Sequence, residues 1–294
     1  MRTAKTAAQL ILGTAGRFYP FSILVRKLIV AVRFRDEVRL LEGKHRSRSE
    51  HQSILFFTLH KTASVYTGNI LHRLTQDAGL TAIDFVKYYS TIDRLGNFYE
   101  FEGLGGVFEP TGYFYGPIRR YVPVPSMELY KAVLMVRDPR DVLTSLYYSN
   151  AYSHFVAYHN PKTARSRLEA RRRALEQTID EFVLVQSPSY LSRYIAYCRH
   201  LLNASNVLLV KYEHMIEDFS AWLLGILEFL DLTPDEGLLN EIVDQADFKV
   251  GEEDIQSHKR QAAPGDHLRK LRSETIDLLN ERFQLVLDQL GYRY

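Results

Sequence analysis

The chain has 294 residues, of which 46% are hydrophobic and 24% are charged, and this composition is typical of a globular protein rather than a disordered or fibrous one. Its single cysteine, Cys198, excludes an internal disulfide, and no Cys/His cluster has the spacing of a structural zinc site. The net charge of +2 is too small to argue for a nucleic-acid partner, and we expect none.

Residues 1–50 are basic and partly apolar, and we predict that they form an extension ahead of one main domain at residues 51–294. Basic side chains interrupt the apolar stretch too often for a membrane-spanning helix, and no convincing signal-peptide cleavage site follows it. Leu24, Leu28 and Val32 share one helical face, which predicts an amphipathic helix. Such a helix docks on the domain or contacts an anionic membrane surface. We therefore expect a cytoplasmic protein, with membrane association left open.

Beyond residue 50, apolar segments of strand length alternate with helical patterns, and no linker or repeat divides them. The pattern predicts strands at 54–59, 105–109, 131–137 and 206–212, with a weaker one near 81–86. It predicts helices at 64–77, 139–152, 164–185, 189–202, 214–230, 235–245 and 273–290. We expect an α/β fold, with a central parallel β-sheet flanked by helices on both faces and a ligand crevice at the carboxyl ends of the strands.

Two of the predicted helices have marked starts. Asp138, Pro139 and Asp141 supply an N-cap, a proline at the first helical position and an acid in the first turn. Residues 233–236 read Thr-Pro-Asp-Glu, which we interpret as a capping box. We expect Arg140 and Asp141 to form an exposed ion pair.

Two strand-to-helix segments are suited to holding an anion. The first, Ile54 to Leu71, has Lys61 in a turn of small and hydroxyl residues. The second, Lys131 to Tyr148, has Arg137 at the strand end and Ser145 eight residues later. A helix start offers unpaired N–H groups and the positive end of the helix dipole. Helical side chains lean toward the N-terminus, so Ser145 and Arg137 can converge on one phosphate. Two such segments predict a ligand with two phosphate groups.

These segments resemble those of sulfotransferases that use 3′-phosphoadenosine 5′-phosphosulfate (PAPS). In that family a Lys-Ser/Thr-Gly-Thr-Thr-Trp loop grips the 5′-phosphosulfate, and an Arg-Asp-Pro-Arg-Asp segment with a later serine grips the 3′-phosphate. Residues 137–141 and Ser145 match the second pattern in full. The first pattern is matched at Lys61, Thr62 and Ser64, whereas Ala63 and Val65 depart from it and Tyr66 stands where an aromatic contacts adenine. The resemblance covers roughly residues 52 to 292 and includes Lys211-Tyr212-Glu213 and Arg260 before Gly265-Asp266.

The resemblance implies a P-loop-like nucleotide fold and transfer of a sulfuryl group from PAPS to an acceptor hydroxyl or amine, without a metal ion. Lys61 would neutralise the bridging oxygen as its bond to sulfur breaks. If the turn requires a positive φ, the methyl group of Ala63 is more costly there than glycine. The implied donor-binding residues are Lys61, Thr62, Ala63, Ser64, Val65, Tyr66, Arg137, Ser145, Tyr212, Lys259 and Arg260.

The residue that accepts the acceptor's proton is not marked by the resemblance. Many family members have a histidine after the third strand, but this chain has none between His72 and His154. Glu109, which follows the predicted third strand, is our candidate, because a carboxylate can act as the base if burial raises its pKa. Rival candidates are Glu102, Asp84 and His60. The aromatic run at 113–117, with Arg119, Arg120 and Tyr121, is a candidate lining for the acceptor cleft.

Two other functions stay open at this point. A P-loop kinase needs Gly-x-x-x-x-Gly-Lys-Ser/Thr, and neither glycine precedes Lys61. A catalytically inactive nucleotide-binding relative would account for Ala63, Val65 and the missing histidine. The acceptor, whether a small molecule, a glycan or a lipid, is not encoded in any pattern of the chain.

Overall fold

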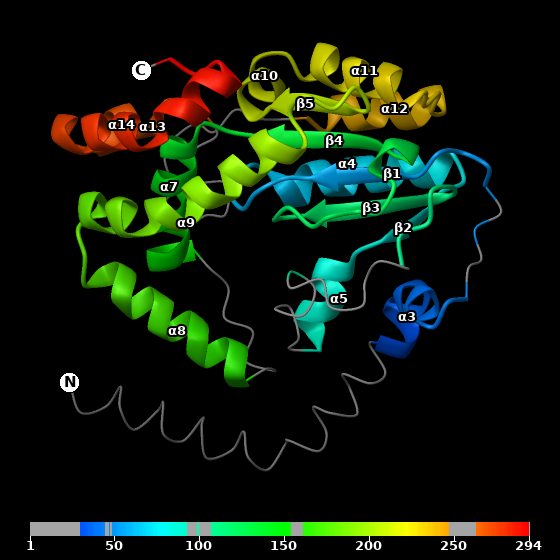
Figure 1. The fold of residues 1–294 in the computed structure, drawn as a ribbon, viewed down its shortest axis with the longest axis horizontal. Helices are drawn as coiled ribbons and strands as arrows, with labels where there is room; N and C mark the ends of the chain where they lie inside the picture. The colour runs from blue at the N-terminus through cyan, green and yellow to red at the C-terminus, as the bar shows by residue number, and fades with distance from the viewer. Residues whose placement is uncertain are drawn as a thin grey trace.

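The computed structural model describes residues 30–44, 47, 49–92, 99, 107–153, 161–246 and 263–293. Its centre is a five-stranded sheet in the order β2-β3-β1-β4-β5, in which every neighbouring pair is parallel. Figure 1 shows this sheet with helices around it. The α/β fold predicted from the sequence is therefore confirmed. The strands are β1 (Ile54–Phe57), β2 (Thr81–Ile83), β3 (Tyr113–Ile118), β4 (Lys131–Val136) and β5 (Val207–Lys211).

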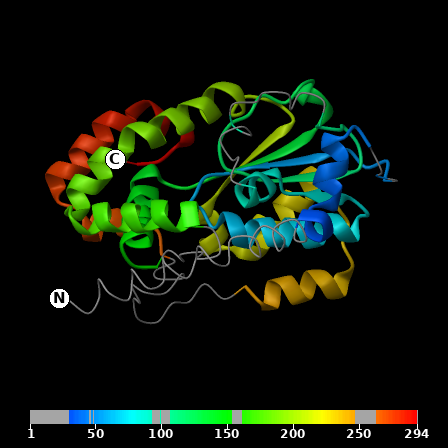
Figure 2. The same cartoon turned by 90° about the horizontal axis from the view of Figure 1, so that it is seen from below.

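Helices cover both faces of the sheet, as Figure 2 shows from below. Strand β1 is buried on both sides: Ile54 and Phe56 face one hydrophobic core, and Leu55 and Phe57 face the other. The first core is closed by α4 (Ser64–Asp77), α11 (Phe219–Leu230) and α12 (Glu236–Asp244). The second is closed by α7 (Pro139–Tyr148), α9 (Ile179–His200) and α14 (Ser273–Leu290). The remaining helices are α3 (Arg35–Leu41), α5 (Phe85–Thr91), α8 (Pro161–Leu175), α10 (Tyr212–Glu217) and α13 (Asp266–Lys270).

The strand order determines where a ligand can bind. After β1 the chain passes through α4 to β2, which lies toward one edge of the sheet. After β4 it passes through α7 and α9 to β5, which lies at the opposite edge. Strands β1 and β4 are neighbours, so the two connections diverge between their carboxyl ends. In open parallel sheets this switch point opens the crevice in which ligands bind.

The third strand differs from its sequence prediction. We expected a strand at 105–109, but residues 107–109 are irregular and the strand is β3. Gly116-Pro117 lies inside β3, where such a pair argues against a central strand. The structure accommodates it because the pairing of β3 with β1 is irregular between Leu55 and Phe57. A side chain at position 116 would bring its Cβ within 2.8 Å of the Phe56 Cβ, so the close approach of these strands requires glycine.

Several helix boundaries also differ. The predicted helices at 164–185 and 189–202 are α8 and a single α9 that runs through Pro188. The predicted helix at 214–230 is divided into α10 and α11, because the Asp218 side chain accepts from the Ala221 N–H and caps α11. The capping box at 233–236 is wrong: Asp235 is the N-cap of α12 and accepts from the Leu238 N–H. The predicted helix at 139–152 is α7, which ends at Tyr148 and is followed by a π-helical turn, Ser149–Ser153.

Part of the N-terminal extension packs on the domain. In α3, Leu40 belongs to the hydrophobic core, and Glu37 accepts a hydrogen bond from the Asp84 N–H at 2.9 Å. Of the predicted apolar face, Leu24 and Leu28 lie outside the described residues, and Val32 is 73% exposed. Within the described part of the chain, no helix is both long and apolar enough to span a membrane.

Candidate active site

The loop after β1 is tightly wound. Lys61 and Ala63 both have positive φ angles, of 71° and 56°, and Ala63 is the N-cap of α4. The Thr62 hydroxyl is buried, where it donates to the Leu59 carbonyl at 2.8 Å and lies 2.6 Å from the Thr58 hydroxyl. Thr62 therefore holds the loop together with its side chain, and any contact it makes with a ligand must come from its backbone.

The first turn of α4 presents the other residues predicted for the first anion site. Ser64 is buried, and its hydroxyl accepts from the Arg119 Nε at 3.2 Å. Val65 is 56% exposed, and Tyr66 is half-buried with its ring 6.2 Å from that of Phe219. Arg119 was predicted only as a lining residue of the acceptor cleft, and its contact with the first anion site follows from its place after β3, the strand that the sequence pattern missed.

Arg137 joins the second loop to the first. Its Nη1 donates to the Lys61 carbonyl oxygen at 3.2 Å, and its guanidinium lies over the Tyr212 ring, 4.3 Å from the centroid. Its Nη2 is 3.6 Å from Asp141. The Nε of Arg137 is buried and has no hydrogen-bond partner in the described part of the chain. An orphaned guanidinium nitrogen at a switch point fits an anionic ligand.

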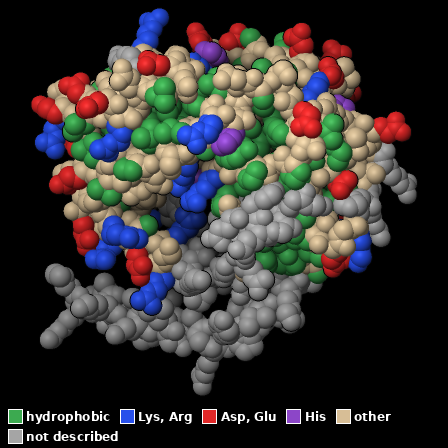
Figure 3. Space-filling view, viewed as in Figure 1, with side chains coloured by type: hydrophobic (Ala, Val, Ile, Leu, Met, Phe, Trp, Pro, Cys, Tyr) green, Lys and Arg blue, Asp and Glu red, His purple; other side chains and the backbone are tan. Residues whose placement is uncertain are grey.

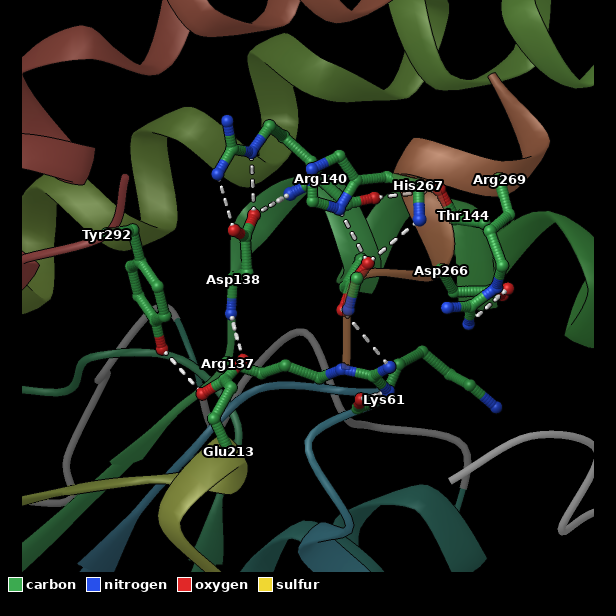
Figure 4. A network of polar contacts seen from close by, with 12 residues as sticks. Lys61, Arg137, Asp138, Arg140, Thr144, Glu213, Asp266, His267, Arg269 and Tyr292 are labelled. Atoms are coloured by element: carbon green, nitrogen blue, oxygen red, sulfur yellow. Dashed lines mark hydrogen bonds and ion pairs between the residues drawn. The ribbon is translucent and has the colours of Figure 1, made fainter. Parts of the chain in front are cut away.

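Asp141 contacts both Arg137 and His267, which are labelled in the polar network of Figure 4. It accepts from the N–H groups of Gly265 and His267 at 2.8 and 2.9 Å and from His267 Nδ1 at 2.7 Å. Burial would raise the pKa of Asp141, but the hydrogen bonds of His267 and the charge of Arg137 outweigh it and hold this pKa well below its usual range. Asp141 thereby ties the start of α13 to α7, next to Arg137.

The expectation of an exposed Arg140–Asp141 pair is wrong. Both residues are buried. The Arg140 Nη2 pairs with Asp138 at 2.6 Å, and its Nη1 donates to Asn280 at 2.6 Å. Asp138 caps α7 as predicted, by accepting from the Arg140 N–H at 2.9 Å. The sequence pattern could not reveal that Arg140 is buried, because Asn280, to which it donates, lies on the distant helix α14.

The second loop is also held in place by α10, the helix that follows β5. Glu213, which follows Tyr212, accepts from the Asp138 N–H at 2.9 Å and from the Tyr292 hydroxyl at 3.0 Å. Ser145 is half-buried in α7, two turns after Arg137. Lys259 and Arg260 lie outside the described residues. The structure therefore brings Lys61, Arg137 and Tyr212 together and leaves Lys259 and Arg260 as predictions.

The structure places Glu109, the predicted base, away from Lys61. Its N–H donates to the Tyr115 hydroxyl at 2.7 Å, and the following carbonyl, of Pro110, accepts from the Ser53 N–H at 2.8 Å. Ser53 precedes β1, whereas Lys61 follows it. Glu109 is therefore at the amino edge of the sheet, separated from Lys61 by the length of β1, about 13 Å.

Two rival bases lie at the correct edge. Asp84 follows β2, but its carboxylate accepts from the Lys87 N–H at 2.8 Å as the N-cap of α5, and burial raises its pKa. His60 adjoins Lys61 on the exposed rim of the loop. The ring keeps contact with solvent at this rim, but desolvation by the surrounding protein and the charges of Arg119 and Arg193 lower the pKa of His60, so the imidazole is neutral at pH 7. The third rival, Glu102, lies outside the described residues.

Comparison with known families identifies the fold. A family model described as the sulfotransferase domain matches residues 122–273, just over half of the chain. The chain belongs to the sulfotransferase family. The match includes the Arg137 loop, α7, α9 and the turn before α13. No curated protein matches this sulfotransferase in sequence.

The mouse sulfotransferase SULT7A1 structure agrees with this assignment at the level of the fold. Mouse sulfotransferase SULT7A1 complexed with PAP is 16% identical, with a TM-score of 0.54 over 85% of this chain and 87% of that chain. Retinol dehydratase in a complex with retinol and PAP is also 16% identical, with a TM-score of 0.46 over 89% and 87% of the two chains.

Proposed function

We propose that this sulfotransferase moves a sulfuryl group from PAPS to an acceptor hydroxyl or amine. The observation that carries the proposal is the meeting of Lys61 and Arg137 at the switch point between β1 and β4, joined by a hydrogen bond of 3.2 Å. The PAP bound by the mouse sulfotransferase is adenosine 3′,5′-bisphosphate, the product that PAPS leaves after transfer, and it supports PAPS as the donor.

The residues present fit such a donor. The orphaned Nε of Arg137 offers a charge-assisted hydrogen bond to the 3′-phosphate. The Ser145 hydroxyl and the predicted Lys259 and Arg260 would add to this site. The backbone N–H groups from Ala63 to Tyr66 begin α4 and would hold the 5′-phosphate. Tyr66 and Tyr212 are proposed to contact the adenine.

The chain needs to supply charge and alignment. In an in-line transfer, the acceptor oxygen forms its bond to sulfur while the bond from sulfur to the 5′-phosphate oxygen breaks, and the electron pair stays on that phosphate oxygen. The ammonium group of Lys61 would offset the growing negative charge there. His60 replaces Glu109 as our proposed proton acceptor, because it adjoins Lys61 and is neutral at pH 7. The negative charge of a bound donor would raise its pKa and strengthen it as a base.

Transfer of radiolabelled sulfate from PAPS to a panel of phenols, alcohols, glycans and lipids tests this function. We expect Lys61→Ala to lower kcat by about 10²–10³ under saturating donor, because Lys61 meets charge that develops in the transition state. Lys44→Ala is the matched control, since Lys44 is an exposed lysine paired with Glu42. An unchanged kcat in Lys61→Ala contradicts its role, and a wild-type protein that binds the donor but transfers to no acceptor supports the inactive relative instead.

A further inference from the structure

Three arginines surround the loop that carries Lys61. Arg119 and Arg120 follow β3, and Arg193 lies on α9. All three, together with Lys61, act electrostatically on His60, so their charges converge on one place at the carboxyl edge of the sheet. Figure 3 shows Lys and Arg side chains in the hollow near the centre of this face of the molecule. We call Arg119, Arg120 and Arg193 the arginine cluster.

Rings and hydroxyl groups, not carboxylates, hold the arginine cluster in position. Arg120 lies over the Tyr99 ring at 4.9 Å, and Arg193 lies over the Tyr190 ring at 4.7 Å and donates to the Ser189 hydroxyl at 3.3 Å. The partner of Arg119 is the Ser64 hydroxyl. In the part of the chain that the structure describes, no carboxylate forms an ion pair with the cluster. Asp84 interacts electrostatically with Arg119, but its carboxylate is already engaged as the N-cap of α5.

Like charges so close together oppose folding unless something neutralises them. Arg119 and Arg193 are half-buried, and burial lowers the pKa of Arg193. Groups arranged at such a cost, in a crevice and without a carboxylate counter-ion among the described residues, are typical of a binding site. An anion from outside the chain would complete the cluster.

The position of the cluster separates it from the donor's 3′-phosphate. Strands β3 and β4 lie on opposite sides of β1, so Arg119 and Arg120 are on one side of Lys61 and Arg137 is on the other. Helix α9 bridges the two sides: the Tyr194 hydroxyl donates to the Arg137 carbonyl at 2.5 Å, and the Tyr197 hydroxyl donates to carbonyls at the ends of β1 and β3. In-line transfer requires the acceptor to approach sulfur opposite the leaving phosphate.

We propose that the arginine cluster binds an anionic group on the acceptor, so that the enzyme sulfates acidic acceptors in preference to neutral ones. The anionic group is a carboxylate, a phosphate ester or a sulfate ester, each of which matches the planar fork of a guanidinium. This assignment rests on the proposed function and specifies the substrate class of the same site.

Matched acceptor pairs test the proposal in the full-length protein. The pairs are 4-hydroxyphenylacetate with its methyl ester, methyl glucuronide with its methyl ester, and glucose 6-phosphate with glucose. We expect kcat/KM at least about tenfold higher for the acidic member of each pair that is sulfated. Comparison of the carboxylate pairs with the phosphate pair shows which anionic group the arginine cluster binds. We expect the double variant Arg120→Gln/Arg193→Gln to lose the preference by raising KM for the acidic member, with little change for the neutral one.

Arg165→Gln/Arg172→Gln on α8 is the matched control, because both arginines are exposed and paired with glutamates on the same helix. A readout without turnover uses protein saturated with adenosine 3′,5′-bisphosphate, in which 4-hydroxyphenylacetate, methyl glucuronide or glucose 6-phosphate should raise the Tm of the wild type and not of the cluster variant. Equal use of acidic and neutral acceptors overturns the proposal and leaves the proposed function intact. If the cluster variant instead weakens adenosine 3′,5′-bisphosphate binding as much as acceptor use, the arginines serve the donor and the proposal fails. Absence of both nucleotide binding and transfer contradicts the proposed function itself.

Discussion

At the scale of single residues, the loop after β1 has two side chains in the left-handed region, Lys61 and Ala63. This conformation costs a residue with a Cβ atom about 1–2 kcal/mol. The proposed role of Lys61 depends on its ammonium group. The methyl group of Ala63 packs against the hydrophobic core, but a half-buried methyl group contributes less than about 0.8 kcal/mol, so the strain of the left-handed conformation is the larger effect.

We therefore expect Ala63→Gly to raise the free energy of unfolding by about 1 kcal/mol, as measured by urea denaturation. The control is Ala78→Gly at the other end of α4, where φ is −78° and glycine should destabilise because it frees the unfolded chain. Adenosine 3′,5′-bisphosphate should bind Ala63→Gly at least as tightly as it binds the wild type, since the N–H at position 63 is kept. A destabilised Ala63→Gly would mean that the methyl group makes a packing contact worth more than the strain.

The same loop shows what the sequence could predict about the site. Lys61 and Arg137 were found because each follows a clear apolar strand, and parallel strands put such residues at one edge of the sheet. Arg119 was singled out only through the aromatic run beside it, as a candidate lining of the acceptor cleft, and Arg193 was not singled out at all. The first follows a strand interrupted by Gly116-Pro117, and the second lies within a helix whose facing elements only the tertiary fold defines.

At the scale of elements, α9 explains a second limit of sequence patterns. The predicted helices at 164–185 and 189–202 leave Pro188 between them, and a proline inside a helix leaves the carbonyl four residues earlier without its helical partner. In the structure the Leu184 carbonyl instead accepts from the Ser187 hydroxyl at 2.8 Å and from Arg282 Nη1 at 2.9 Å. Arg282 belongs to α14, which packs on α9. A partner from a distant helix thus allows α9 to continue across the carboxyl ends of the strands.

Helix α3 contains a buried carboxyl group whose ionisation makes the stability of the protein depend on pH. Glu37 is 5% exposed, and burial raises its pKa from 4.5 to about 7. Because the folded state favours the protonated form, this contribution to stability is complete below pH 4.5 and is lost as the pH rises through 7. The full difference corresponds to about 3 kcal/mol.

We expect Glu37→Gln to be close to the wild type in stability at pH 5 and more stable than it at pH 8, by up to about 3 kcal/mol. The glutamine carbonyl can still accept from the Asp84 N–H, so the packing of α3 is kept. Urea unfolding across this pH range measures the effect, with Glu42→Gln, an exposed change just after the helix, as the control. A constant difference between Glu37→Gln and the wild type at all pH values would show that Glu37 does not titrate on unfolding.

At the scale of the whole molecule, the site is assembled from distant parts of the chain. Lys61 and Arg137 are 76 residues apart in sequence and meet because β1 pairs with β4. Asp141 links α7 to the turn before α13, and Glu213 on α10 links the Arg137 loop to Tyr292, which follows α14. A ligand that bridges the two loops should therefore stabilise the domain as one unit and not only the loops it contacts.

Adenosine 3′,5′-bisphosphate at about 100 times its Kd should stabilise the protein by about 2.7 kcal/mol and raise its Tm by roughly 5–10 °C. AMP and adenosine 2′,5′-bisphosphate at the same concentration should raise the Tm by about half as much or less. Each lacks a phosphate in position for Arg137, and the loss of that contact weakens binding about tenfold or more. The 2′,5′ isomer carries the same charge and so controls for unspecific attraction. In Arg137→Ala the three nucleotides should give similar small shifts in differential scanning fluorimetry, whereas Lys44→Ala should keep the wild-type order. If the wild type responds equally to the 3′,5′ and 2′,5′ isomers, Arg137 does not read the position of the phosphate, and the proposed donor site is wrong.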